Sequence, residues 1–108
     1  MRLNQYFIRQ EFACKCGCGF DVVDVTLLNF YTFVRVDSGL AMIILSGCRC
    51  DTHNHNIGGL SNSLHTKGKA GDITTRQGIQ PIVDRLDKWP YQSVVYRDRG
   101  FVHIEIDQ

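Results

Sequence analysis

The sequence predicts a small α+β domain, with a mostly antiparallel sheet, two main helices and one long loop. Three observations support this class. The chain has 108 residues, 44% of them hydrophobic and 21% charged, as in an ordinary globular domain with one core. Two segments have the apolar spacing of amphipathic helices, and four short segments have the apolar or alternating pattern of strands. We therefore expect a single domain over residues 1–108.

The first half of the chain is predicted to hold a loop, a helix and a strand. Residues 11–20 are rich in Cys and Gly and show no usable period, which indicates a loop. Residues 25–36 are predicted to be a helix, capped by Asp24 or Thr26 and ended by Ser38-Gly39. Its apolar stripe, at positions i, i+3, i+4 and i+7, consists of Leu27, Phe30, Tyr31 and Val34. Residues 41–45 form a short apolar run that predicts a buried strand.

The second half begins with a long loop and ends in a hairpin. Residues 46–68 hold three of the four histidines and predict a functional loop, with one helical turn near 53–57. The elements expected after it are a strand at 69–74, a helix at 79–89 with Pro81 in its first turn, and strands at 93–97 and 101–106 around an Asp98-Arg99-Gly100 turn. The expected core face of the second helix consists of Ile79, Ile82, Val83 and Leu86.

Charge and hydropathy exclude several function classes. The formal net charge is +1, without the basic stripe of a nucleic-acid-binding protein. The longest apolar run, residues 40–45, is far too short to cross a bilayer. The N-terminal residues lack the apolar core and cleavage site of a signal peptide. We therefore expect a monomer that is made in the cytoplasm and binds neither nucleic acid nor membrane.

Two imidazoles and one carboxylate form the strongest candidate site. His65 ends the long loop, Asp72 lies on the strand that follows, and Gly68 allows a sharp turn between them. On the last strand, Val102, Ile104 and Ile106 alternate with His103 and Glu105, so His103 is expected to point away from the core. A His-Asp-His set leaves a fourth position on a tetrahedral zinc open for water. On spacing alone, ordinary surface residues remain the alternative.

Five cysteines fall in two groups, Cys14, Cys16 and Cys18 in one and Cys48 and Cys50 in the other. An odd number cannot be fully paired within one chain. We expect thiols that pack or form disulfides. The alternative is a second, structural zinc, since the spacing from Cys14 to Cys18 suits one ion and either Cys48 or Cys50 could add a ligand.

Several motifs, in this order, closely resemble those of zinc D-Ala-D-Ala carboxypeptidase-like peptidases. This family includes phage endolysins that cut peptidoglycan stem peptides, and it shares its fold with the Hedgehog signalling domain. The matching segments are Ser46-Gly47-Cys48-Arg49-Cys50, His53-Asn54, Gly58-Gly59, Ser63 to Asp72 and Val102 to Glu105. The cysteine-rich loop over residues 12–19 also looks like this group.

The resemblance implies a peptidase with one catalytic zinc on His65, Asp72 and His103. It also implies that Arg49 stabilises the oxyanion or binds a substrate carboxylate, and it places Ser63 in the substrate-binding segment. Cys48 stands where the family usually has an aromatic residue. Related enzymes carry a catalytic acid shortly before the last histidine. Here the candidates for the general base are Asp98, which we favour slightly, and Glu105.

The expected function is therefore hydrolysis of a peptidoglycan stem peptide at the cell wall, either at D-Ala-D-Ala or at L-Ala-D-Glu. A bare domain of this kind suggests a phage or prophage product released at lysis, or a wall-remodelling enzyme. Two alternatives stay open. One is a non-catalytic, zinc-containing module that binds wall peptide or a protein partner. The other places the only metal site among the cysteines with His53 and His55.

Overall fold

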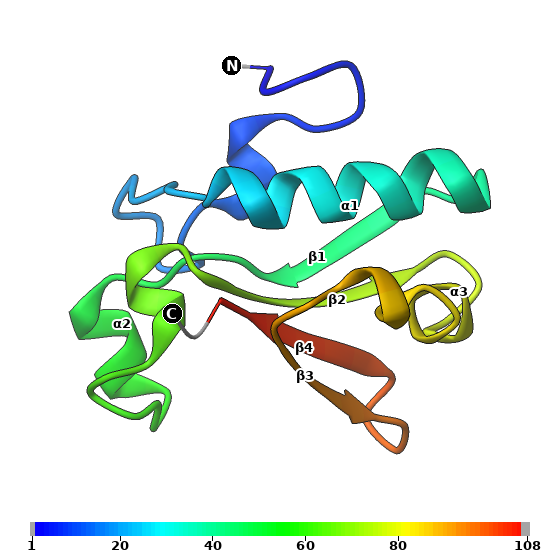
Figure 1. The fold of residues 1–108 in the computed structure, drawn as a ribbon. Coiled ribbons are helices and arrows are strands. Elements are labelled where there is room, and N and C mark those ends of the chain that lie inside the picture. Colours follow the sequence, from blue (N-terminus) through cyan, green and yellow to red (C-terminus); the bar gives the residue numbers. More distant parts are fainter. Residues whose placement is uncertain (1, 107–108) are drawn as a thin grey trace.

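The computed structural model of the protein describes residues 2–106. A four-stranded, fully antiparallel sheet in the order β1-β2-β4-β3 lies against a long helix, α1 (Figure 1). The strands are β1 (Met42–Ser46), β2 (Ala70–Thr75), β3 (Gln92–Tyr96) and β4 (Phe101–Glu105). The helices are α1 (Val25–Ser38), α2 (Asp51–Asn56) and α3 (Gln80–Val83), with short 3-10 turns at η1 (Arg9–Phe12), η2 (Leu64–Lys67) and η3 (Leu86–Lys88). The predicted α+β class and antiparallel sheet are confirmed.

Helix α1 forms where the apolar spacing predicts it and ends at its expected signals. The Asp24 side chain accepts a hydrogen bond from the backbone N–H of Thr26 at 2.8 Å, which caps the first turn. Gly39 adopts φ +73° and its N–H bonds the carbonyl of Arg35, a left-handed helix end that favours glycine. All four predicted stripe residues are buried: Leu27, Phe30, Tyr31 and Val34.

The core lies between α1 and one face of the sheet. Ile73, Val102 and Ile104 are fully buried on that face. Because side chains alternate along a strand, the residues between them point to the opposite face, away from α1. That opposite face carries Asp72 on β2 and His103 with Glu105 on β4, which are only partly buried. The alternation predicted for β4 is thus confirmed, and it separates the core from the site.

Two predicted elements need correction. Strand β1 is not buried on both faces: Ile43 and Leu45 are 40% and 43% exposed, because β1 is an edge strand with α1 on one side only. The predicted helix over 79–89 is broken into α3 and η3. The Arg85 N–H bonds the carbonyl of Ile82, three residues back, so the chain tightens and leaves the α-helical path. The four apolar residues of that segment nevertheless pack on the core as expected.

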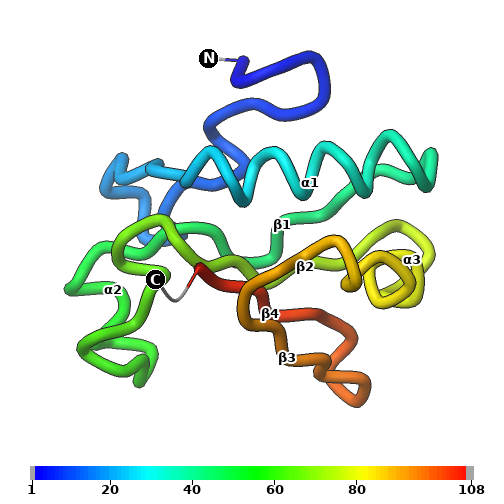
Figure 2. Tube along the Cα trace, in the orientation of Figure 1, coloured from blue at the N-terminus to red at the C-terminus, as the bar shows by residue number. Residues whose placement is uncertain are grey.

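The long predicted loop folds into two short helical elements that border the sheet. The expected helical turn is α2, which begins two residues earlier than predicted, at Asp51. The η2 turn ends at Gly68, which has φ +68° and lies so close to the Val22 carbonyl that a Cβ there would be 2.7 Å from it. The tube in Figure 2 shows α2 next to the cysteine-bearing loop before α1, although the two are far apart in sequence. No helix among residues 2–106 is long and apolar enough to cross a membrane.

Candidate metal centre

Three ligand side chains meet on the sheet face opposite α1, and we call them the cleft cluster: His65, Asp72 and His103. One ligand atom from each lies within 4.8 Å of the others. Asp72 and His103 are direct cross-strand partners in the β2–β4 pairing, which brings Asp72 Oδ1 to 2.7 Å from His103 Nδ1. His65 comes from η2, and its Nε2 lies 3.6 Å from Asp72 Oδ2.

The ring of His65 is held in one orientation by a backbone carbonyl. Its Nδ1 lies 2.7 Å from the carbonyl oxygen of Gly47. A carbonyl only accepts, so Nδ1 carries a proton, and in the neutral ring Nε2 has the lone pair that a metal ligand needs. Gly47 itself packs closely on the Phe12 backbone, since a Cβ there would lie 2.5 Å from the Phe12 carbonyl oxygen. This backbone support is the kind that fixes a metal-binding histidine.

His103 lies between two carboxylates. Its Nδ1 faces Asp72, and its Nε2 lies 2.8 Å from Oε1 of Glu105. The hydrogen bond with Asp72 raises the pKa of His103, burial opposes this, and the contact with Glu105 raises it further. Burial alone would raise the pKa of Asp72, but the hydrogen bonds and charges of His103 and His65 outweigh it and hold that pKa well below its ordinary value. Without a metal, His103 is therefore readily protonated and Asp72 stays ionised.

The cluster opens into a cleft of about 640 Å³. Arg49, Ser63 and Glu105 line this cleft together with the three cluster residues. Further residues line it that sequence reasoning missed: Leu60, Asn62, Leu64, Tyr96, Arg99 and Phe101. Tyr96 and Phe101 flank the β3–β4 turn, and their ring centroids are 4.8 Å apart. An aromatic residue on each side of the predicted turn was the signal in the sequence for this part of the cleft.

Arg49 is oriented by a buried amide. Its Nη1 donates to Oδ1 of Asn54 at 2.9 Å, while its Nη2 lies 3.9 Å from Asp72 Oδ2. Asn54 is 2% exposed, and its own amide group donates to the Leu60 carbonyl at 2.7 Å. Gly59 leaves room for this pair, since a Cβ there would lie 2.1 Å from Asn54 Oδ1. Asn54 was named in the sequence only as part of a motif, and its positioning role depends on this tertiary contact.

The two candidates for the general base lie in different places. Glu105 lines the cleft and touches His103, because both side chains leave the same face of β4 and bend towards each other. Asp98 is exposed in the turn between β3 and β4 and does not line the cleft. The geometry therefore favours Glu105 over the acid that the sequence slightly favoured.

The cysteines group differently in space than in the sequence. All five lie among the described residues, and each is a free thiol. Cys14, Cys16, Cys18 and Cys50 gather in one place, and we call them the thiol cluster. Cys48 is buried elsewhere, with its thiol 3.2 Å from the Phe12 carbonyl and 3.1 Å from that of Phe20, and burial raises its pKa to about 11. Within residues 2–106, neither His53 nor His55 joins either cluster.

The donor set of the cleft cluster fits zinc. Ligand distances of roughly 2.0–2.2 Å around a tetrahedral ion place neighbouring N and O donors about 3.4 Å apart. The distance from His65 Nε2 to Asp72 Oδ2, 3.6 Å, is close to this length. Nε2 is the His65 nitrogen left for a metal, because Nδ1 bonds the Gly47 carbonyl. Three protein ligands beside an open cleft leave room for a water and a substrate group.

Comparison with known proteins identifies a family for the chain. A protein-family model described as Peptidase M15 matches residues 5–105, which is nearly the whole chain. The match spans the thiol cluster, the cleft cluster, Arg49 and Glu105. Neither a curated protein nor a solved structure matches the chain.

Proposed function

The chain belongs to the Peptidase M15 family, and from this premise we propose that it is a zinc-dependent peptidase that hydrolyses stem peptides of peptidoglycan. The observation that carries the proposal is the meeting of His65, Asp72 and His103 in a cleft that also holds an acid and a guanidinium. The bond would be D-Ala-D-Ala or L-Ala-D-Glu, since both present a carboxylate to Arg49. The site of action would be the bacterial wall, after release of a phage or prophage product at lysis.

His65, Asp72 and His103 would hold the zinc. A bound zinc supplies a Lewis acid that polarises the scissile carbonyl and lowers the pKa of water towards neutrality. Glu105 is the proposed general base, because its carboxylate lies in the cleft and is partly buried. Its oxygen takes the proton from the attacking water and returns it to the leaving amine when the C–N bond breaks.

Arg49 would bind negative charge in the cleft. Its Nη1 is already engaged by Asn54, so the guanidinium is fixed in one orientation before substrate arrives. A permanently charged, planar group held in this way suits a substrate carboxylate or the oxygen that becomes negative during attack. Ser63, which lines the same cleft next to η2, would contribute a hydroxyl to the bound peptide.

The test is mass spectrometry of muropeptides after incubation with the zinc-loaded protein, with and without a chelator. We expect chelator-sensitive loss of D-Ala or release of a new D-Glu amino group. E105Q should lower kcat by roughly 10²–10⁴-fold, as loss of a general base does, whereas the exposed-turn variant D98N should keep kcat within about twofold. E105D, which retains the carboxylate, should restore part of the loss.

Each outcome has a distinct meaning. Zinc-loaded protein that binds wall peptide but releases no product would favour the non-catalytic binding module. A large decrease of kcat in D98N, with a normal kcat in E105Q, would show that Asp98 is the general base. If the decrease of kcat/KM at acidic pH disappears in E105Q, Glu105 is the base. If E105Q keeps the wild-type pH profile and only its kcat is lower, Glu105 is a residue that only positions His103.

A further inference from the structure

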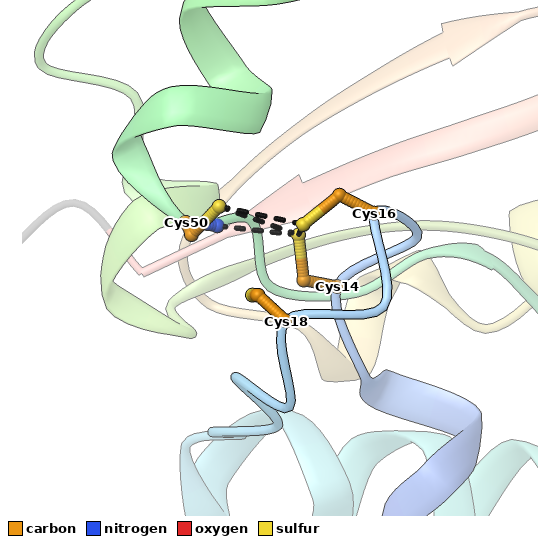
Figure 3. Close-up of side chains that lie close together, drawn as sticks. All are labelled: Cys14, Cys16, Cys18 and Cys50. Atoms are coloured by element: carbon orange, nitrogen blue, oxygen red, sulfur yellow. Dashed lines mark hydrogen bonds between the residues drawn. The ribbon is translucent and has the colours of Figure 1, made fainter.

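The thiol cluster lies outside the cleft and has no part in the proposed reaction. Cys14, Cys16 and Cys18 come from the loop that precedes α1, and Cys50 is the N-cap residue of α2. Figure 3 shows the four side chains close together between these two segments, with the sulfurs of Cys14, Cys16 and Cys50 facing one another. Two of the four, Cys16 and Cys18, are otherwise exposed to solvent, so burial of apolar surface does not explain their convergence.

The spacing of the sulfur atoms is that of ligands around one ion. The Sγ atoms of Cys14, Cys16 and Cys50 are 3.4, 3.6 and 3.8 Å apart, and the Sγ of Cys18 lies within 4.8 Å of all three. A disulfide would need about 2.05 Å between two of them. Zinc–sulfur bonds of about 2.3 Å in a tetrahedral site place the sulfurs about 3.8 Å apart. Four thiols at such distances have the arrangement of a closed Cys₄ site.

Backbone N–H groups are also directed at the sulfurs. The N–H of Cys50 points to Sγ of Cys14 at 3.4 Å, and the N–H of His53 points to Sγ of Cys50 at 3.4 Å. Donors of this kind stabilise thiolate ligands and orient them. The fifth thiol behaves differently, because Cys48 donates to two backbone carbonyls and stays apart from the cluster.

We propose that Cys14, Cys16, Cys18 and Cys50 bind a second zinc ion, which is structural and distinct from the one in the cleft. With four protein ligands the site is closed and has no position for a substrate. The ion joins the loop over residues 14–18 to the start of α2. Because Arg49 precedes Cys50 directly and Asn54 lies on α2, the ion anchors the segment that holds the guanidinium at the edge of the cleft.

Counting zinc in the full-length protein tests the proposal without an activity assay. Protein purified under reducing conditions should contain two zinc ions per chain by native mass spectrometry and elemental analysis. C50S should contain one, and H103A, which removes a ligand of the cleft cluster, should also contain one. C48S is the matched control, since it removes a neighbouring buried cysteine outside the cluster, and should keep two.

A second measurement does not require any cysteine variant to fold. In H103A protein, zinc X-ray absorption should show four sulfur neighbours at about 2.3 Å. Titration of the same protein with a mercurial should release its zinc as four thiols react.

The proposal would be overturned by a zinc in H103A bound by nitrogen and oxygen, or by wild-type protein with one zinc and freely reactive Cys16 and Cys18. Loss of zinc from C48S but not from C50S would also overturn it, because it would place the ion elsewhere.

Discussion

The cleft cluster and the thiol cluster differ in what holds their donor atoms in place. In the cleft cluster, Asp72 and His103 are neighbours in a sheet, and His65 is fixed by the Gly47 carbonyl. In the thiol cluster, three of the four donors lie on a loop in which Gly17 and Gly19 have positive φ, and besides one another the sulfurs contact two backbone N–H groups. The first arrangement is organised before any ion binds, whereas the second depends on its ion.

This difference matches the two uses of zinc in proteins. A catalytic site keeps a position open and needs ligands that stay in place while substrate and water exchange. A structural site uses all four positions for protein ligands, and its binding energy contributes to folding. We therefore expect ligand loss in the cleft cluster to abolish turnover, and ligand loss in the thiol cluster to lower stability.

The largest effect should come from removing a ligand of the cleft cluster. H103A should lower the rate of peptide hydrolysis by at least about 10³-fold, since the activated water and the polarised carbonyl are both lost. Its thermal unfolding midpoint should fall less than that of C50S, because the apolar neighbours of His103 on β4 stay in the core. Activity assays paired with calorimetry test this. An H103A protein that unfolds at a much lower temperature would show that the cleft cluster is structural as well.

The reverse pattern is expected for the thiol cluster. C50S should lower the free energy of unfolding by about 3 kcal/mol, since an ion joining residues 36 apart removes loop-closure entropy of roughly 4 kcal/mol from the unfolded chain. The corresponding decrease in unfolding midpoint is roughly 10–20 °C. Below the new midpoint, hydrolysis should stay within about tenfold of wild type, because the cleft ligands are intact. C48S measures the cost of losing a buried thiol alone, and a C50S protein as stable as wild type would contradict the role of the ion.

The fold and the orientation of His103 were predictable because their signals are local and periodic, whereas the ligand set itself was implied by the family resemblance. Val102, Ile104 and Ile106 alternate with His103 and Glu105, so the strand itself separates core from cleft. The spacing of Leu27, Phe30, Tyr31 and Val34 likewise specified the buried face of α1. Each pattern is complete within a few residues, and each is confirmed.

The thiol cluster and the position of Asp98 were less predictable because both depend on tertiary placement. Cys48 and Cys50 are two residues apart and equivalent by spacing. Only the packing of the chain at Phe12 shows that Cys48 is covered and Cys50 faces the loop. Similarly, Asp98 is exposed and does not line the cleft, although Arg99 next to it in the same turn does. The break between α3 and η3 has no proline or glycine to mark it, and the backbone of Arg85 alone reveals it.

Asn54 connects the two regions, so its removal should produce an intermediate effect. N54A takes away the acceptor that holds Arg49 and leaves the Leu60 carbonyl without its donor, which should lower kcat/KM by about tenfold and stability by roughly 1–2 kcal/mol. The zinc content should stay at two per chain. H55A, on an exposed position of the same helix, is the control. Normal kcat/KM in N54A would show that Arg49 needs no orientation from α2.

The smallest effect concerns the pH dependence of the metal-free protein, and its cleft-cluster part arises from His103 and Asp72. The folded-state pKa of His103 is raised above its ordinary value of 6.5, chiefly by Asp72, so the protonated ring stabilises the fold at lower pH. This contribution is lost as pH rises through the raised pKa. The pKa of Asp72 is lowered, so its contribution is present above the pKa of an unfolded aspartate and is lost as pH falls through the folded value.

Chelator-treated protein should therefore show an unfolding midpoint in denaturant that declines from about pH 6.5 upwards, where the His103 ring of the unfolded chain begins to lose its proton. Zinc should remove this decline, because the ion replaces the proton that His103 shares with Asp72, and its affinity increases as that proton is lost. H103Q keeps a polar side chain without a titrating group, and should show no such decline with or without chelator. A decline of equal size in H103Q would assign the alkaline effect to other groups and remove the evidence that His103 is protonated between its two carboxylates.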